Sequence, residues 1–274
     1  MSLLRGKNII VILTLIISTV GISNALTIIS SISPNIPSEY NPPGGLTWDG
    51  SYLWISVTPA RSGGPPTGKI YKVSPIDGSI ITALDSPGSA PYGIAWDGSY
   101  LWNVDRSSKF IYKIDPISGV VLFSIQIPDL TGEPLGLAYG DGYLWLIEWY
   151  WTWPYRVFKI NPQTGDMISS FPAPDRNWGI AWDGISLWSS NPRLDLIYRM
   201  SPQTGSVLAS YSYPGAYPTG LAWDGAYLWC ADYQARRIYK LDVRAAPIPE
   251  PSTFIFIGIG LLGIKLMRRK KLRR

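Results

Sequence analysis

The stretch GLTWDGSYLW (Gly45–Trp54) decides the fold, because close copies of it return along the whole chain. Four further copies are GIAWDGSYLW (Gly93–Trp102), GLAYGDGYLW (Gly136–Trp145), GIAWDGISLW (Gly179–Trp188) and GLAWDGAYLW (Gly220–Trp229). The spacings from one opening glycine to the next are 48, 43, 43 and 41 residues. A period of this size indicates an architecture built from one repeated supersecondary unit.

Each copy is predicted to form four antiparallel strands. The first apolar strand ends in an Asp-Gly pair, which favours positive φ at consecutive positions and therefore a tight hairpin, and the Y-L-W run returns beside it. A loop of variable length leads to an alternating third strand such as IYKIDP (Ile111–Pro116). A P-x-x-G turn then leads to a fourth strand such as VVLFSIQIP (Val120–Pro128).

Four short strands recurring at about 40–45 residues are typical of propeller blades, since one small sheet cannot bury both of its faces without neighbours. The sequence therefore predicts an all-β fold, a five-bladed β-propeller of four-stranded antiparallel blades over residues 26–243. The last copy has no fourth strand, whereas residues 27–34 (TIISSISP) resemble one. We expect this N-terminal strand to close the last blade and remove an open edge. The alternative is a disordered mature N-terminus.

Residues 1–25 are typical of an export signal. Two basic residues precede an apolar run from Ile9 to Val20, and Ser23-Asn24-Ala25 is a small-residue cleavage site. A membrane anchor is the alternative, but the apolar run is shorter than the ~20 residues that a spanning helix needs. We therefore predict a signal peptide that is cut after Ala25.

Three features follow one another at the C-terminal end. Pro249-Glu250-Pro251 lies in a Pro-rich spacer over residues 244–252, and an apolar stretch from Phe254 to Met267 precedes a basic cluster. The sequence predicts a transmembrane helix and a basic sorting tail over residues 253–274, with the basic cluster in the cytoplasm and the repeats outside. The apolar stretch reaches only ~21 Å as a helix, so lysine snorkelling and bilayer thinning have to make up the difference.

This tripartite tail resembles the PEP-CTERM sorting domain of exported bacterial proteins. The resemblance implies recognition by a membrane-embedded sorting protease of the exosortase type, with cleavage near Pro249, Glu250 and Pro251. It also implies that the tail first anchors the protein in the membrane, and that processing then leads to release or to attachment at a cell surface or matrix rich in exopolysaccharide. A plain C-terminal anchor is the alternative.

The formal net charge of +5 comes from the two ends of the chain. Residues 26–251 carry 15 basic and 19 acidic side chains, so the exported part is mildly acidic, with a net charge of −4. This argues against nucleic acid as a partner, since neutralising phosphates needs a basic face. The lone Cys230 cannot form an internal disulfide and is expected to pack in the core.

The chain contains no histidine, which removes the usual imidazole base, Ser-His and Cys-His nucleophile pairs and the common zinc sites. No cofactor and no metal are therefore expected. A pair of carboxylates is the remaining route to acid–base catalysis, and Asp105, Glu148 and Asp232 are the candidates.

The candidate binding residues come from the loops between the second and third strands, which differ sharply from copy to copy. Propeller topology places these loops on one face together with the connections between blades, and variable loops on a repeated scaffold usually carry specificity. Three residues beyond the second-strand tryptophan stand Val57, Asp105, Glu148, Asn191 and Asp232. The four polar side chains either bind a hydroxyl or cation at the mouth of a central channel or accept backbone N–H bonds in their own loops.

A dense aromatic cluster follows one of these positions and comprises Trp149, Trp151 and Trp153, with Arg156 close behind. Exposed indoles stack on the apolar faces of sugar rings, so these residues, with Trp178 in a connection between blades, are candidates for binding a polysaccharide. The alternative is that the alternating tryptophans pack against a neighbouring blade. The tryptophans at fixed positions of the repeat are expected to pack between blades.

The repeat unit, with its L-W-x-x-D and I-Y-K-I-D-P stretches, is similar to that of the YVTN/NHL and streptogramin-lyase group of extracellular propellers over residues 44–243. The lyases of that group rely on a histidine that this chain lacks, so the resemblance implies their scaffold and not their activity. Our leading hypothesis is an exported, surface-associated, non-catalytic binding or scaffold protein, for extracellular polysaccharide or a protein partner. The alternative is a carboxylate-dependent lyase or hydrolase, or an enzyme like the five-bladed glutamine cyclotransferases, on the same face.

Overall fold

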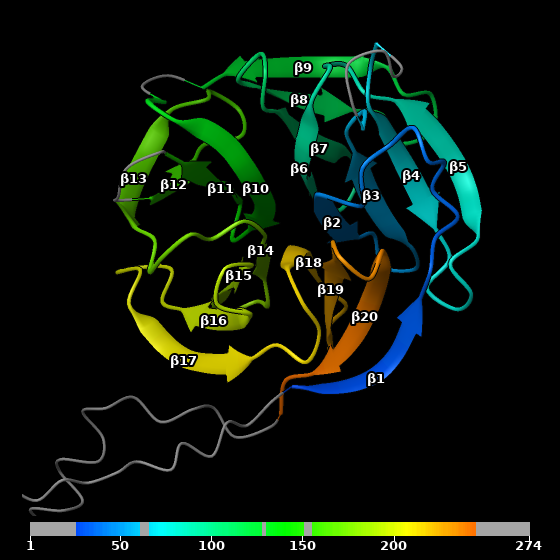
Figure 1. Cartoon of the computed structure of the whole chain (residues 1–274). Helices are drawn as coiled ribbons and strands as arrows, with labels where there is room; N and C mark the ends of the chain where they lie inside the picture. The colour runs from blue at the N-terminus through cyan, green and yellow to red at the C-terminus, as the bar shows by residue number, and fades with distance from the viewer. Residues whose placement is uncertain (1–25, 61–65, 128–129, 151–154, 245–274) are drawn as a thin grey trace, which may run out of the picture.

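The computed structural model describes residues 26–60, 66–127, 130–150 and 155–244. Five four-stranded antiparallel sheets stand around a common axis, so the predicted all-β, five-bladed propeller is confirmed (Figure 1). These described residues include no helix that is long and apolar enough to cross a membrane. The predicted signal peptide and the predicted transmembrane helix lie outside the described residues.

In blades 1 to 4 the strands follow one another from the axis outward in the order of the sequence. Blade 1 comprises β2 (Gly45–Trp48), β3 (Leu53–Val57), β4 (Lys69–Val73) and β5 (Ile80–Asp85). Blade 2 comprises β6 (Pro91–Trp96), β7 (Leu101–Asp105), β8 (Phe110–Ile114) and β9 (Val121–Gln126). Blade 3 comprises β10 (Glu133–Gly140), β11 (Tyr143–Trp149), β12 (Arg156–Ile160) and β13 (Met167–Pro172). Blade 4 comprises β14 (Ile180–Trp182), β15 (Leu187–Asn191), β16 (Leu196–Met200) and β17 (Val207–Ser212).

Blade 5 joins the two ends of the described chain. It comprises β18 (Pro218–Trp223), β19 (Leu228–Asp232), β20 (Arg237–Asp242) and, as its outer strand, β1 (Thr27–Ile32). β1 lies beside β20 in Figure 1 and pairs with it antiparallel, with Thr27 opposite Asp242. The Leu26 N–H donates to the Ser212 carbonyl of blade 4 at 3.0 Å, and the Leu26 side chain is buried. The predicted closure of the last blade by the N-terminal strand is therefore confirmed.

The opening glycine of each repeat lets neighbouring blades meet backbone to backbone at the axis. The innermost strands β2, β6, β10, β14 and β18 line the centre of the ring in Figure 1, and consecutive ones are in contact. A Cβ atom on Gly179 would clash with the Thr219 carbonyl oxygen, and one on Gly45 would clash with the Tyr92 carbonyl oxygen. The space between the opening glycines has no room for a water molecule, so the axis is closed at this level.

Stacked tryptophans join neighbouring blades, as the sequence led us to expect. The indole of Trp48 in blade 1 stacks on that of Trp229 in blade 5, with ring centroids 6.4 Å apart and planes 9° apart. Two further pairs have the same geometry, Trp182 on Trp145 and Trp223 on Trp188. Each pair combines an innermost strand with the second strand of the preceding blade, so the same contact joins blades 5 and 1, 3 and 4, and 4 and 5.

The Asp-Gly hairpins carry a second recurring contact, which the sequence did not reveal. In blade 2 the Asp97 carboxylate accepts a hydrogen bond from the Trp102 indole N–H at 2.8 Å and lies 3.4 Å from the Lys113 ammonium. It also accepts the backbone N–H groups of Ser99 and Tyr100. The equivalent sets are Asp49 with Trp54 and Lys72, Asp183 with Trp188 and Arg199, and Asp224 with Trp229 and Lys240.

The prediction of positive φ at both the Asp and the Gly is wrong for four of the five hairpins. The glycines Gly50, Gly98, Gly184 and Gly225 have φ between 97° and 99°, whereas the aspartates before them do not have positive φ. The reason is that each of these aspartates turns its carboxylate back onto the N–H groups two and three residues on. In blade 3 Asp141 and Gly142 both have positive φ, 55° and 79°, and there the Trp145 indole donates to the Gly140 carbonyl instead.

Candidate functional site

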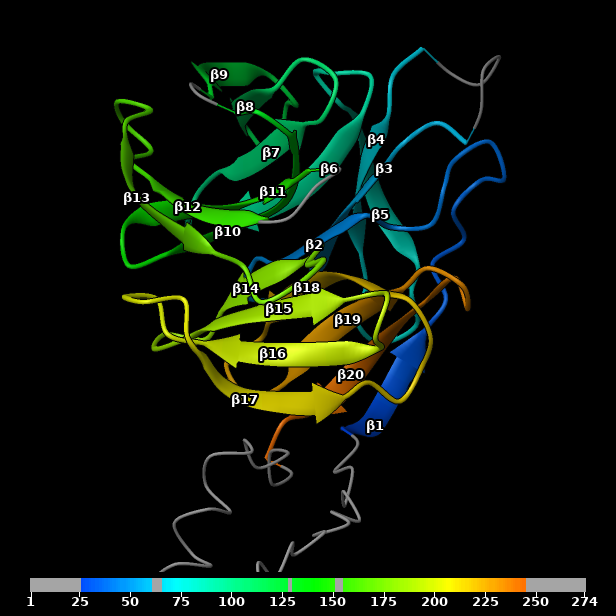
Figure 2. The ribbon, with the colours of Figure 1, turned by 60° about the vertical axis from the view of Figure 1, so that its left-hand side comes forward.

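The propeller has two faces of different construction. One face, the turn face, carries the hairpins between first and second strands and the P-x-x-G turns between third and fourth strands. The opposite face, the loop face, carries the loops between second and third strands and the connections between blades. Figure 2 shows the strands of blade 4 running between these faces. Because Thr27 pairs with Asp242, the start of β1 and the end of β20 both lie on the turn face.

The polar positions predicted on the loop face are buried. The Asp105 side chain is 0% exposed, and its carboxylate accepts the Ala90 N–H of the preceding connection at 2.6 Å and the Ser108 N–H of its own loop at 2.7 Å. Asp232 is 1% exposed and accepts equivalent backbone bonds from the two segments that flank it. Each carboxylate therefore ties a variable loop to the connection that precedes its blade.

The blade 4 position uses an amide for the same purpose. The Asn191 side-chain carbonyl accepts the N–H groups of Arg193 and Leu194 at 3.0 and 3.1 Å, while its NH₂ group donates to Asp175 at 3.0 Å. Val57 holds the equivalent place in blade 1 and is buried. Four blades thus stabilise their loops from one polar position.

Two residues that the sequence analysis singled out, Glu148 and Arg156, contact each other in the structure. One carboxylate oxygen of Glu148 accepts the Gly132 N–H at 2.6 Å and the Thr131 hydroxyl at 3.2 Å. The other oxygen forms an ion pair with the Arg156 guanidinium at 2.9 Å. The Glu148 side chain is 2% exposed, so this carboxylate is enclosed by its partners.

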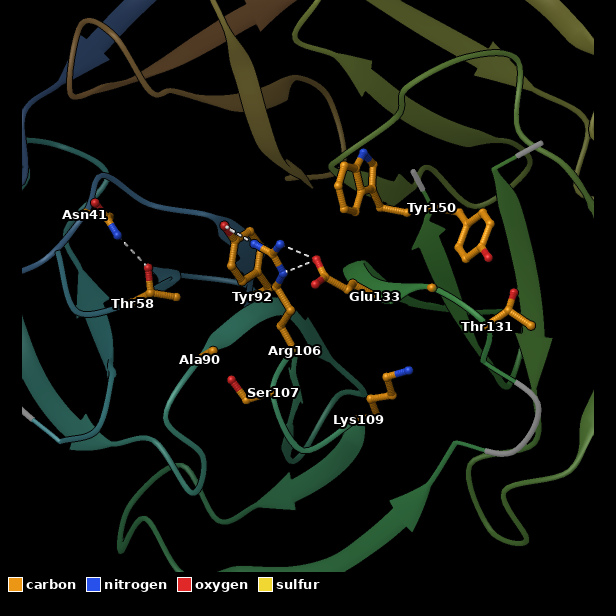
Figure 3. A pocket seen from close by; sticks show the side chains of 12 residues that line it. Asn41, Thr58, Ala90, Tyr92, Arg106, Ser107, Lys109, Thr131, Glu133 and Tyr150 are labelled. Atoms are coloured by element: carbon orange, nitrogen blue, oxygen red, sulfur yellow. Dashed lines mark hydrogen bonds and ion pairs between the residues drawn. The ribbon is translucent and has the colours of Figure 1, made fainter. Parts of the chain in front are cut away.

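A cavity of about 650 Å³ opens on the loop face between blades 1, 2 and 3. Figure 3 shows Arg106 in its middle, between Tyr92 and Glu133. The Arg106 guanidinium donates from Nε to Glu133 at 2.5 Å and from a terminal nitrogen to the Tyr92 hydroxyl at 3.4 Å. The other described residues around the cavity are Asn41, Thr58, Ala90, Ser107, Lys109, Thr131, Gly132, Trp149 and Tyr150.

Aromatic rings hold the Arg106 guanidinium from two sides. Its central carbon lies 5.3 Å from the centre of the Tyr92 ring and 5.8 Å from that of the Trp149 ring, within the range of cation–π attraction. Tyr150 adds a ring that is 37% exposed. The cavity therefore combines a fixed charge pair with aromatic surface, which is the composition expected of a site for a polar ligand with an apolar face.

A row of aromatic rings continues from this cavity around the loop face. Tyr92 meets Trp178 edge to face at 6.4 Å, Trp178 meets Tyr217 at 5.5 Å, and Tyr217 meets Tyr233 at 5.6 Å. The Tyr233 hydroxyl then lies 3.5 Å from the side-chain oxygen of Asn41, on the rim of the same cavity. We call this row, with the cavity, the aromatic arc.

Within the arc, Tyr217 has a left-handed backbone conformation and a hydroxyl group with a raised pKa. This residue has φ of 64°, and its N–H donates to the Asp195 carboxylate at 2.8 Å. Burial raises the pKa of the Tyr217 hydroxyl, and the neighbouring Tyr233 and Tyr92 raise it further. The ring is therefore held as a neutral, hydrogen-bonding group at neutral pH.

The predicted site residues are distributed over three settings. Trp149 lines the cavity and Trp178 belongs to the aromatic arc. Glu148 and Arg156 form an ion pair beside it, while the remaining polar positions, Asp105, Asn191 and Asp232, are bonded within their loops. Trp151 and Trp153 lie outside the described residues.

Sequence reasoning missed Tyr92, Arg106, Lys109, Glu133, Tyr217 and Tyr233. A signal was available for Tyr92, because it stands directly before an opening glycine, as Trp178 does. No comparable signal marks the Arg106–Glu133 pair, whose members come from different blades and are separated by 27 positions.

Other chemically reactive groups do not converge on this face. Cys230 is 0% exposed, and burial raises the pKa of its thiol, which keeps it protonated; its predicted place in the core is confirmed. Within the part of the chain that the structure describes, no three acidic or cysteine side chains are placed to share a metal ion.

Comparisons with known proteins separate the tail from the propeller. Residues 247–271 match the PEP-CTERM protein-sorting motif, which implies export, membrane anchoring through the C-terminal end and exosortase-type processing. No curated protein sequence matches the chain.

Solved structures share the propeller fold. The glutaminyl cyclase of Myxococcus xanthus is similar with a TM-score of 0.65 and 12% identity, covering 79% of this chain and 95% of the cyclase. The virginiamycin B lyase of Staphylococcus aureus is similar with a TM-score of 0.46 and 20% identity, covering 78% of this chain and 98% of the lyase. At 12% identity the similarity to the cyclase describes the scaffold and leaves the activity open.

Proposed function

We propose that this protein is an exported, surface-associated propeller that binds extracellular polysaccharide through the aromatic arc of its loop face, without catalysing a reaction. The observation that carries the proposal is the arc itself. It presents Tyr92, Trp149, Trp178, Tyr217 and Tyr233 around one rim, next to hydrogen-bonding groups of a 650 Å³ cavity.

Aromatic rings of this kind suit a sugar chain. Their apolar faces accept the C–H faces of sugar rings, while Tyr hydroxyls and Trp N–H groups bond sugar hydroxyls. The arc passes through the connections of several blades, so it offers successive contacts along an extended polymer. A protein partner is the second ligand class that such a surface would take, since Tyr, Trp and Arg are enriched at protein interfaces.

The sorting tail supports the surface role through its position in the fold. Both ends of the described chain leave from the turn face, and the PEP-CTERM motif follows β20 after a short Pro-rich spacer. When the tail is inserted in a membrane, the turn face is therefore the nearer one and the loop face points outward. We propose domain limits of 1–25 for the signal peptide, 26–243 for the propeller, 244–252 for the spacer and 253–274 for the membrane and sorting tail, with cleavage near Glu250.

The state of the carboxylates favours binding over catalysis. An acid–base pair needs carboxyl groups that reach the reacting bond. Asp105, Glu148 and Asp232 are almost fully buried and accept hydrogen bonds from backbone N–H groups of the loops and connections around them. Glu133, which does line the cavity, is paired with Arg106. The neighbouring cyclase shares the scaffold only, at 12% identity.

The test is glycan binding by the full-length protein in a non-ionic detergent, measured on an array of neutral and acidic polysaccharides. Tyr150→Ala and Tyr233→Ala should each weaken binding by about fivefold or more, as expected for aromatic anchors. Phe123→Ala is the matched control, because Phe123 is 41% exposed on the outer strand β9, outside the arc.

The polysaccharide proposal is wrong if the folded protein binds no glycan on the array. It is also wrong if the arc variants and the control lose glycan binding to the same extent. Product formation from a retained glycan, abolished by Glu148→Gln with binding and melting temperature unchanged, would favour a carboxylate-dependent lyase or hydrolase instead. Mass spectrometry of the secreted form would locate the processing site near Pro249-Glu250-Pro251.

A further inference from the structure

The loop-face cavity carries positive charge on a propeller that is otherwise acidic. Its described lining holds the cations Arg106 and Lys109 and the single carboxylate Glu133. Residues 26–251 together have a net charge of −4. A local reversal of sign inside a concave site concentrates ligands of the opposite charge there.

The two cations differ in how they are satisfied. Arg106 forms an ion pair with Glu133 and lies between the rings of Tyr92 and Trp149, so its charge is neutralised and its position is fixed. Lys109 has no carboxylate within ion-pair distance among the residues that the structure describes, and its ammonium lies 3.4 Å from the neutral Leu130 carbonyl. Within the described residues its positive charge is therefore not neutralised by a carboxylate, in contrast to that of Arg106.

The backbone holds Lys109 firmly at the cavity. Lys109 has φ of 59°, a left-handed conformation that an ordinary side chain adopts at a cost. Its N–H donates to the Asp105 carbonyl at 3.0 Å, and the Asp105 side chain ties the same loop to the preceding connection. The ammonium thus stands on a positioned loop of the cavity whose wall also includes Trp149 and Tyr150.

We infer that this cavity selects an acidic sugar, a uronic acid unit whose carboxylate binds the Lys109 ammonium while its ring rests on the aromatic wall of Trp149 and Tyr150. The inference rests on the proposed function, because it names the class of polysaccharide for the same face. Hydroxyl groups of Ser107 and Thr131 lie around the cavity to bond the sugar hydroxyls. A neutral hexose would use the wall and leave the ammonium without a counter-charge.

The experiment compares two probes that differ only in charge, an oligogalacturonate of about six units and the same oligomer with its carboxyl groups reduced to alcohols. Binding to the full-length protein is measured by calorimetry at low and high salt. Lys109→Gln should weaken the acidic oligomer about three- to fivefold at low salt, in the range of a partly exposed ion pair, and leave the neutral oligomer unchanged. High salt should remove most of this difference.

Two further variants guard against a general charge effect. Arg193→Gln makes the same change in net charge at an exposed residue of the loop face outside the cavity, and it should leave both oligomers unchanged. Glu133→Gln raises the charge of the cavity and should tighten the acidic oligomer alone. Melting temperatures of the variants establish that each one is folded.

The outcomes separate this inference from the proposed function. If the neutral oligomer binds as tightly as the acidic one and Tyr150→Ala weakens both, the polysaccharide site stands and its preference for acidic sugars is wrong. Equal losses for Lys109→Gln and Arg193→Gln, or no tightening with Glu133→Gln, also overturn the preference. If the folded protein binds neither oligomer and no other glycan, both proposals fall together.

Discussion

The turn face and the loop face of this propeller are built on the same strands but use opposite strategies. On the turn face four blades repeat one contact, in which an aspartate binds an indole N–H, two backbone N–H groups and a cation. On the loop face each blade has a different loop, and in blades 2, 4 and 5 one buried polar side chain stabilises it. The repeated contacts therefore supply the scaffold, and the departures from the repeat supply the aromatic arc.

Blade 3 shows both strategies in one sheet. Its hairpin replaces Trp-Asp-Gly by Tyr139-Gly140-Asp141-Gly142, so the carboxylate leaves the indole and lies 3.9 Å from Lys159. The described start of its loop, Trp149 and Tyr150, lines the cavity. Blade 3, which departs from the repeat on the turn face, also supplies Glu133, Trp149 and Tyr150 to the candidate site.

The largest effect is expected where the shared scaffold closes on its axis. Gly45→Ala places a methyl group against the Tyr92 carbonyl and 2.6 Å from the Ser56 hydroxyl, so neighbouring blades must move apart. Overpacking of this kind costs about 1–3 kcal/mol, which lowers the melting temperature by roughly 2–12 °C in a domain of this size. Thermal unfolding followed by circular dichroism measures the shift.

Gly44→Ala is the matched control for that substitution. The added methyl group would lie 3.5 Å from the Tyr92 ring, an ordinary contact. The melting temperature should stay close to that of the parent protein. Equal losses for the two alanines would show that close approach at the axis does not govern stability.

The next largest loss of stability is expected at the repeated aspartate contact of the turn face, and it should be much smaller at Asp141, the corresponding aspartate of blade 3. Asp97→Asn removes the charge that pairs with Lys113 and places an amide opposite the Trp102 indole. The loss should be about 1.5–3 kcal/mol, the range for a hydrogen bond to a charged group. Asp141→Asn should cost much less, since Trp145 bonds the Gly140 carbonyl and Asn tolerates positive φ. Urea unfolding of both variants measures the difference.

Acid should weaken the turn face through the same carboxylates. Burial alone would raise the pKa of Asp97, but hydrogen bonds from Trp102, Tyr100 and Ser99, with the charge of Lys113, outweigh it and hold the pKa below the usual 3.8. Asp49 and Asp224 are lowered in the same way. The unfolded chain therefore binds protons first, so this stability is present above pH 3.8 and is lost as the pH falls through the lower folded-state values.

The measurement is the free energy of unfolding at about pH 5 and about pH 3, in the parent protein and in Asp97→Asn. The drop on acidification should be smaller in the variant, because one linked carboxylate is missing. A drop of the same size in both proteins would show that Asp97 does not contribute to the pH dependence.

The smallest effect on stability is expected on the loop face. Tyr233→Ala truncates a ring that is 36% exposed and touches Tyr217 and Asn41. Surface changes of this kind usually alter stability by no more than about 0.5 kcal/mol. The melting temperature should therefore stay nearly constant while glycan binding weakens. A large loss of stability would mean that the arc holds the blades together and is not set apart for a ligand.

Much of the fold could be predicted because the sequence contains five copies of one structural repeat. The alternation of apolar and polar residues, the Asp-Gly hairpins and the P-x-x-G turns gave the strands, and the missing last strand pointed to residues 27–34. The hairpin geometry was predicted wrongly, because φ at Asp49 and its equivalents follows the hydrogen bonds of the carboxylate and not the Asp-Gly pair alone.

Less of the candidate site could be predicted. Trp149 and Trp178 stood out as aromatic residues in loops, and both belong to the aromatic arc. The sequence left open whether Asp105, Glu148, Asn191 and Asp232 bind a ligand or bond their own loops, because the answer depends on where each side chain points, and the structure describes all four as buried. Backbone N–H groups of the adjoining loops and connections lie within reach in the folded blade, so they occupy these side chains first.

By itself the sequence determined the number of blades, the strand that closes the ring and the presence of a sorting tail, since repeats and terminal motifs are local patterns. Only the tertiary structure decided that Arg106 meets Glu133 and that Tyr92, Trp178, Tyr217 and Tyr233 form one row. These residues come from different blades, and ring closure, which packs glycine backbones against one another at the axis, is what brings their loops to a common rim.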